Sequence, residues 1–293
     1  MSIVKLKHND RNHWDNIRHL VSVIEMLNKT TNSQIHISSS GFATPFQVIP
    51  LACFLNLKKL SYQINDQQSD LASYLNTIKF PQGVNLRAVT IGSSGNYLPI
   101  GRIHGSKRQG EVRDENYKQI EDQYRELVLN CFPTVRDTLS NAIAFFLSEL
   151  IENAKDHSEA NNFYVFAQYW PLLKQIELCM MDDGIGLRGS LAKRYAQITS
   201  DEIAVREVIQ RQLSVRISEF EALPGTGLAN TIRIVSNNEL SSTFTIISGN
   251  YGFSSVNKNS RWIDLKETSL PGTLINIRIV EPNSRLNIFD YIQ

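Results

Sequence analysis

The chain has 293 residues, of which 42% are hydrophobic and 20% are charged, so it can bury the core of one large or two ordinary domains. Its 30 basic and 29 acidic residues leave a net charge of +1, so neither nucleic acid nor an anionic membrane is indicated as a partner. Three widely spaced cysteines, a polar start and the lack of an apolar run near the ~20 residues that span a bilayer predict a cytoplasmic protein with buried thiols.

The first hundred residues alternate between helix and strand patterns. The expected elements are, in chain order, helix Asp15–Lys29, strand Ser33–Ser39, a helix opening at Pro45, strand Leu60–Ile64, helix Asp70–Thr77 and strand Val84–Ile91. Such alternation is typical of a small α/β domain, which we assign to residues 1–100. The apolar residues of the second helix run from Phe46 to Leu55, and Pro50 is an unfavourable residue in its interior. Residues 101–125 are strongly charged, and we expect a solvated linker or surface helix there.

Residues 126–293 carry a different pattern, with long helices and strands in pairs. The expected elements are helix Pro133–His157, strands Phe163–Trp170 and Gln175–Met181, a partly helical stretch Arg188–Pro224, a helix ending near Asn237, and strands Ser242–Ser248 and Thr273–Val280. This order predicts an α+β two-layer sandwich, with helices on one face of a mixed or antiparallel sheet.

The helix at 133–157 carries a carboxylate and a carboxamide four residues apart, Glu149 and Asn153. Residues i and i+4 of a helix share a face. A carboxamide oxygen is a hard ligand of the kind that Mg²⁺ accepts, and a carboxylate can deprotonate an attacking water or hydroxyl. Taken alone, the pair is also typical of solvated helix surface.

The second motif is the D-x-G-x-G of Asp182, Gly184 and Gly186, directly after an apolar strand. Glycines let a ligand approach the backbone closely. A carboxylate at a strand end can accept a hydrogen bond from an adenine amino group. Taken alone, this motif is also typical of a tight turn, and Asp183 is only its variable position.

The third motif, Gly225-Thr226-Gly227-Leu228, opens the next expected helix. Backbone N–H groups at a helix N-terminus form an anion site suited to phosphates. A single G-x-G is weak evidence, so its meaning depends on the other two motifs.

In this order, followed by Gly272-Thr273, the motifs resemble the N-box, G1 box and G2 box of the GHKL ATPase superfamily, which contains histidine kinases, gyrase B, MutL and the ninety-kilodalton heat-shock chaperones. The resemblance covers about Thr134 to Val280 and implies a Bergerat-type fold that binds ATP and Mg²⁺. It implies Glu149 as catalytic base, Asn153 as Mg²⁺ ligand, Asp182 as adenine ligand with Gly184 and Gly186 beneath the nucleotide, Gly225, Gly227 and Leu228 as phosphate loop, and Thr273 as the residue that backs the adenine pocket through water.

The branch of the superfamily stays open. His157, four residues after Asn153, resembles the histidine of the N-A-x-x-H motif in anti-sigma serine kinases, and equally a solvated histidine at a helix end. Asp156 instead resembles the aspartate of the chaperone and MutL branch. Residues 188–224 occupy the place of the family's ATP lid or form a surface insertion. The expected apolar contacts of that stretch, such as those of Val208, would form when the lid closes.

The N-terminal residues weakly resemble a STAS domain, the α/β module that partners anti-sigma kinases. Ser38, Ser39 and Ser40 lie where some STAS domains are phosphorylated, or form a serine-rich turn. The combined interpretation is a slow Mg²⁺-dependent ATPase that acts as a nucleotide-gated regulatory module. The alternatives are an anti-sigma-like protein serine kinase and an ATP-switched interaction module without turnover. We expect a protein partner on the N-terminal domain or the lid, leave a homodimer open, and expect residues 126–293 to bind ATP alone.

Overall fold

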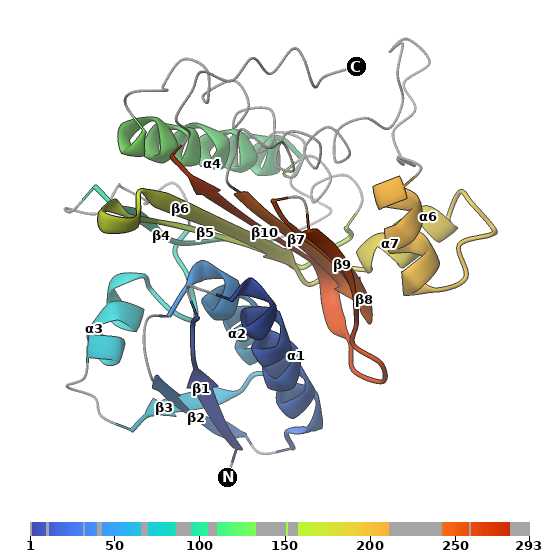
Figure 1. Cartoon of the computed structure of the whole chain (residues 1–293), viewed down its shortest axis with the longest axis horizontal. Coiled ribbons are helices and arrows are strands. Elements are labelled where there is room, and N and C mark those ends of the chain that lie inside the picture. Colours follow the sequence, from blue (N-terminus) through green and yellow to red (C-terminus); the bar gives the residue numbers. More distant parts are fainter. Residues whose placement is uncertain are drawn as a thin grey trace.

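The computed structural model describes residues 2–9, 12–31, 33–39, 43–65, 70–85, 95–104, 110–132, 151, 158–210, 242–257 and 259–281. They form a mixed α/β structure with a three-stranded parallel sheet and a seven-stranded antiparallel sheet (Figure 1). All three cysteines are buried free thiols, as their spacing predicts. None of the helices in these ranges is long and apolar enough to cross a membrane.

The parallel sheet belongs to the N-terminal residues. Its elements are β1 (Ser2–Leu6), α1 (His13–Lys29), β2 (Gln34–Ser39), α2 (Pro45–Leu57), β3 (Ser61–Ile64) and α3 (Asp70–Thr77), with strand order β1-β2-β3. The expected α/β alternation is confirmed, and β1 is added to it. The strand expected from Val84 shows only an isolated bridge between Val84 and Gly101, and residues 86–91 lie outside the described ranges.

Local sequence explains where α1 and α2 begin. The side chain of Asn12 accepts N–H groups of the first turn of α1. α2 begins at Pro45, where a missing N–H is harmless. It also continues through Pro50, which confirms the helix predicted from the apolar residues up to Leu55. All residues from Pro45 to Leu55 are buried, so packing on every side outweighs the hydrogen bond that Pro50 removes.

The antiparallel sheet has the strand order β4-β5-β6-β10-β7-β8-β9. Its strands are β4 (Tyr97–His104), β5 (Asn162–Trp170), β6 (Gln175–Asp182), β7 (Ser242–Gly249), β8 (Tyr251–Val256), β9 (Asn259–Asp264) and β10 (Leu270–Val280), and the short 3₁₀ turn η3 (Pro171–Leu173) joins β5 to β6. The four expected strands of this half are confirmed as β5, β6, β7 and β10. β10 lies between β6 and β7 and pairs with both.

One face of this sheet is covered by α4 (Gly110–Cys131), α6 (Gly186–Ala192) and α7 (Asp201–Gln210) (Figure 1). Tyr124 and Leu127 of α4 are fully buried in the core on this face. Of the two alternatives expected for residues 101–125, a solvated linker and a surface helix, the structure has a helix, and this helix packs on the sheet. The described residues of 101–125 complete β4 and form most of α4.

The opposite face of the sheet is covered by the N-terminal half. α2 contacts β5, β6 and β10, and a second core unites Phe46 and Phe54 of α2 with Tyr164, Met181 and Leu274 of the sheet. The second half was expected to form a two-layer sandwich with helices on one face of its sheet, whereas the structure covers both faces. The sheet has layers on both faces, because its second face is also apolar.

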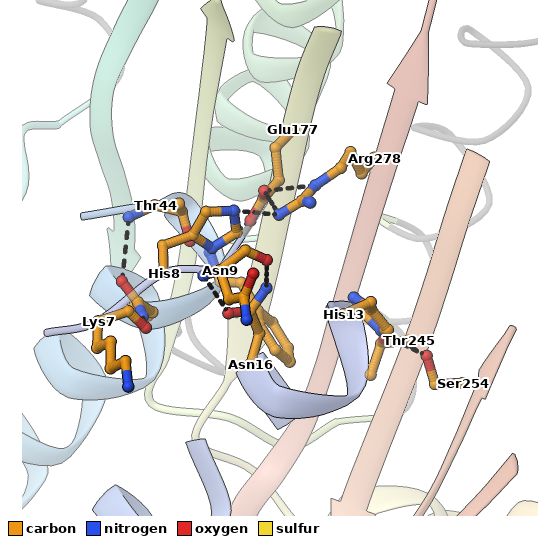
Figure 2. Close-up of polar contacts among 12 residues, drawn as sticks. Lys7, His8, Asn9, His13, Asn16, Thr44, Glu177, Thr245, Ser254 and Arg278 are labelled. Atoms are coloured by element: carbon orange, nitrogen blue, oxygen red, sulfur yellow. Dashed lines mark hydrogen bonds and ion pairs between the residues drawn. The ribbon is translucent and has the colours of Figure 1, made fainter. Parts of the chain in front are cut away.

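Buried polar contacts also join the two halves (Figure 2). Glu177 on β6 is fully buried and accepts two hydrogen bonds from Arg278, at 3.0 Å and 2.7 Å, and one from the Phe46 N–H at 2.9 Å. His13 of α1 lies 2.9 Å from the Ser254 hydroxyl, and burial lowers the pKa of His13 to about 4. The N-terminal half is therefore held to the sheet by specific pairs as well as by apolar packing.

Candidate functional site

Asp182, the last residue of β6, has a buried carboxylate with a backbone donor on each oxygen. The Gly184 N–H donates to Oδ1 at 2.8 Å, and the Thr273 N–H donates to Oδ2 at 3.1 Å. Burial raises the pKa of Asp182 to about 7, against the effect of these hydrogen bonds. Each oxygen keeps a lone pair, so the ionised carboxylate can accept an N–H from a ligand.

Two glycines let the chain close around this carboxylate. A Cβ at Gly184 would overlap the Ser158 carbonyl oxygen and lie 2.8 Å from Asp182 Oδ1. Gly272 has a φ of +63°, and a Cβ there would overlap Asp182 itself. Larger residues at either position would displace the carboxylate. The D-x-G-x-G motif points to Gly184, whereas the sequence indicates Gly272 only as the neighbour of Thr273.

Thr273 reaches Asp182 because β10 lies beside β6. Leu274 is opposite Met181 in the antiparallel register, which sets Thr273 across from Asp182. Leu178 and Met180, the residues of β6 on the same face as Asp182, belong to the core under α4 and α7. The structure therefore brings Asp182, Gly184 and Thr273 together on the face of the sheet that carries these helices.

Asp183 has a structural task that the sequence did not suggest. Its carboxylate accepts the backbone N–H groups of Asn161 and Asn162, both at 2.8 Å, and the Asn162 side-chain amide at 2.6 Å. These bonds fasten the end of β6 to the start of β5. Asp183 thus holds the loop, while Asp182 contributes the buried carboxylate of the candidate site.

The remaining expected site residues lie outside the described ranges: Glu149, Asn153, Gly225, Gly227 and Leu228. The same holds for Ser40, Asp156 and His157. Ile151 is helical, 3% exposed and part of the core under α4, so one residue of the expected Glu149 helix lies on the face that carries Asp182. Among the described residues, no group of three or more His, Cys, Asp and Glu side chains is placed to hold a metal ion.

α6 and α7 are the described part of the expected lid. Apolar side chains of α6, of α7 and of the segment between them form a small core made of Leu191, Ile198, Ala204 and Val208. Arg206 of α7 lies over the Trp262 ring at 4.3 Å and donates to the Tyr251 hydroxyl at 2.6 Å. Val208 is buried in this small core. α6 and α7 form a packed wall beside the site, and residues 211–224 lie outside the described ranges.

Comparison of the chain with protein-family models, curated proteins and solved structures finds no match. The chemistry of the site is therefore the basis for assigning a function. A buried carboxylate with unused lone pairs suits an N–H donor and repels an anion. The glycine backbone around it lets such a donor approach closely.

Proposed function

We propose that this chain binds ATP in a GHKL-type nucleotide site, in which Asp182 accepts a hydrogen bond from the adenine amino group. The observation that carries the proposal is the buried Asp182 carboxylate between the Gly184 and Thr273 N–H groups. These two backbone donors leave lone pairs on the carboxylate that can accept a further N–H. The adenine amino group supplies that N–H donor.

The position of the site in the sheet supports the proposal. Asp182 and Thr273 come from motifs far apart in the sequence, yet they are hydrogen-bonded neighbours on β6 and β10. The GHKL resemblance expects both residues in one adenine pocket. It also expects helices on the face of an antiparallel or mixed sheet that carries the nucleotide, and α4, α6 and α7 lie on that face.

The chemistry of hydrolysis follows the resemblance. Glu149 deprotonates the attacking water, and the backbone of Gly225, Gly227 and Leu228 holds the phosphates. Asn153 would hold Mg²⁺, which would supply positive charge to neutralise the phosphates. A slow ATPase of this kind suits a regulatory module, with a protein partner on the N-terminal half or on the lid. Transfer to a protein serine and ATP binding without turnover are the two alternatives.

Nucleotide binding is tested by calorimetry with a non-hydrolysable ATP analogue and Mg²⁺. We expect one site per chain. Asp182→Asn should weaken binding by about 1–3 kcal/mol, because it removes a charged acceptor from a buried hydrogen bond. Asp264→Asn, an exposed carboxylate on β9, is the matched control and should bind like the wild type. Wild-type protein that binds no ATP at millimolar concentration would refute the proposal.

Turnover is tested separately with Glu149→Gln, which keeps the shape of the side chain and removes the base. The variant should bind ATP like the wild type and release phosphate about 10²-fold more slowly. Equal phosphate release by the two proteins would reject Glu149 as the catalytic base, and wild-type protein that binds ATP but releases no phosphate would favour the ATP-switched module. Transfer of radiolabel from ATP to a protein serine would instead favour the kinase.

A further inference from the structure

Ser248 connects the two loops of the candidate site. It lies near the end of β7 and is 1% exposed. Its Oγ accepts the Leu187 N–H at 2.8 Å and lies 3.2 Å from both the Gly272 carbonyl oxygen and Thr273 Oγ1. One hydroxyl therefore touches the segment after the D-x-G-x-G motif and also the β10 residues that hold Asp182.

The surroundings leave room for little more than a serine hydroxyl. A Cβ at Gly186 would lie 2.8 Å from Ser248 Oγ. Leu187 is the second residue of α6, and the preceding Ile185 gives this helix no side-chain cap. Ser248, on strand β7, thus accepts the Leu187 N–H in the way that the side chain of an N-cap residue usually does.

The Ser248 hydroxyl can donate only one hydrogen bond, and its choice of acceptor decides whether the Thr273 hydroxyl donates or accepts. If Ser248 donates to the Gly272 carbonyl, its oxygen accepts from both the Leu187 N–H and the Thr273 hydroxyl, and three hydrogen bonds form. If Ser248 donates to Thr273 instead, only two form and the Gly272 carbonyl loses this donor. The first arrangement satisfies more buried groups and is favoured. In it, Thr273 Oγ1 has only lone pairs left to offer a ligand.

We propose that Ser248 is a positioning residue that makes the site selective for bases with an exocyclic amino group. The ionised carboxylate of Asp182 and the acceptor-only hydroxyl of Thr273 together offer a ligand two acceptors. An amino group brings two N–H donors, whereas the carbonyl oxygen of hypoxanthine brings none. The inference rests on the proposed function, because it takes the ligand to be a nucleotide whose base lies at Asp182.

The first experiment needs no nucleotide and measures amide hydrogen exchange at Leu187 by NMR. Ser248→Ala removes the acceptor, so this amide should exchange about tenfold faster. Ser255→Ala is the matched control, since Ser255 is also a buried serine and faces the same side of the sheet, opposite Phe244. It should leave Leu187 exchange unchanged. Unchanged exchange of the Leu187 amide in Ser248→Ala would refute the hydrogen bond between Ser248 and Leu187.

The second experiment compares the affinities of ATP and inosine triphosphate, which carries hypoxanthine, by calorimetry. Wild-type protein should prefer ATP, and Ser248→Ala should lower the ratio of the two affinities by about tenfold. Ser255→Ala should keep the wild-type ratio. Equal weakening of both nucleotides in Ser248→Ala would refute the selectivity role and leave the proposed function intact. Wild-type protein that binds neither nucleotide would refute both.

Discussion

Among single residues, Asp182 has the clearest consequence for pH. Burial raises its pKa to about 7, and an amino group binds its ionised form. Ligand binding therefore competes with protonation. We expect the affinity for adenosine to rise between about pH 6 and pH 8, by about tenfold per unit well below the pKa, and then to level off.

Calorimetry with adenosine is the suitable measurement, because adenosine has no phosphate that titrates in this range. Asp182→Asn should bind more weakly and with little pH dependence. Stability without ligand should follow the opposite trend. The folded state holds a proton on Asp182 that the unfolded state has lost, so stability falls as pH rises from about 4 through 7. A flat affinity profile for the wild type would argue against Asp182 as the base ligand.

Residue by residue, the motifs predicted the parts of the site that have a characteristic spacing. Asp182, Gly184 and Thr273 meet as expected, because strand pairing sets the register of β6 and β10. Ser248 and the loop-fastening role of Asp183 were not predicted. A lone serine on a strand has no spacing to recognise, and its role depends on which strand becomes its neighbour.

At the scale of elements, the buried Glu177 of β6 joins two neighbours: it forms an ion pair with Arg278 of β10 and accepts a hydrogen bond from the start of α2. Glu177 accepts from Arg278 and from the first turn of α2, and it has no access to solvent. Glu177→Gln leaves the Arg278 charge buried without a counter-charge. We expect a loss of about 3–5 kcal/mol in the free energy of unfolding.

Urea unfolding of a double-mutant cycle measures this coupling. Arg278→Met alone should also be strongly destabilising, because it leaves the Glu177 carboxylate unpaired. Glu177→Met combined with Arg278→Met should recover most of the stability, since two methionines can fill the space without charge. Additive losses in the double variant would show that the pair is not coupled.

The predicted elements were those with strong apolar patterns. β5, β6, β7 and β10 are buried on both faces, and their sequences are correspondingly apolar. β9 is a polar edge strand and β8 contains Gly252 and two serines, so the apolar pattern of the sequence predicts neither strand. The sequence of α4 is rich in charged residues, which is why it is also compatible with a linker.

For the whole molecule, the shared core changes the expectation for truncation. Deleting residues 1–125 would remove β4, most of α4 and the cover over Tyr164, Met181 and Leu274. We now expect the fragment 126–293 to aggregate and to bind no ATP, although all the motifs lie within it. The full chain should unfold in one calorimetric transition. A soluble fragment with a cooperative transition and normal ATP affinity would show that the second half folds alone.

The central place of β10 also matters while the protein is being made. β6 and β7 each receive their inner partner only when Leu270 to Val280 have left the ribosome. Until then, both strands have unpaired edges that can pair with strands of other chains. Nascent chains that lack β10 should therefore depend on chaperones. Thr273 arrives on the same strand. If the proposed site is right, the nascent polypeptide stays insensitive to ATP until the sheet has closed.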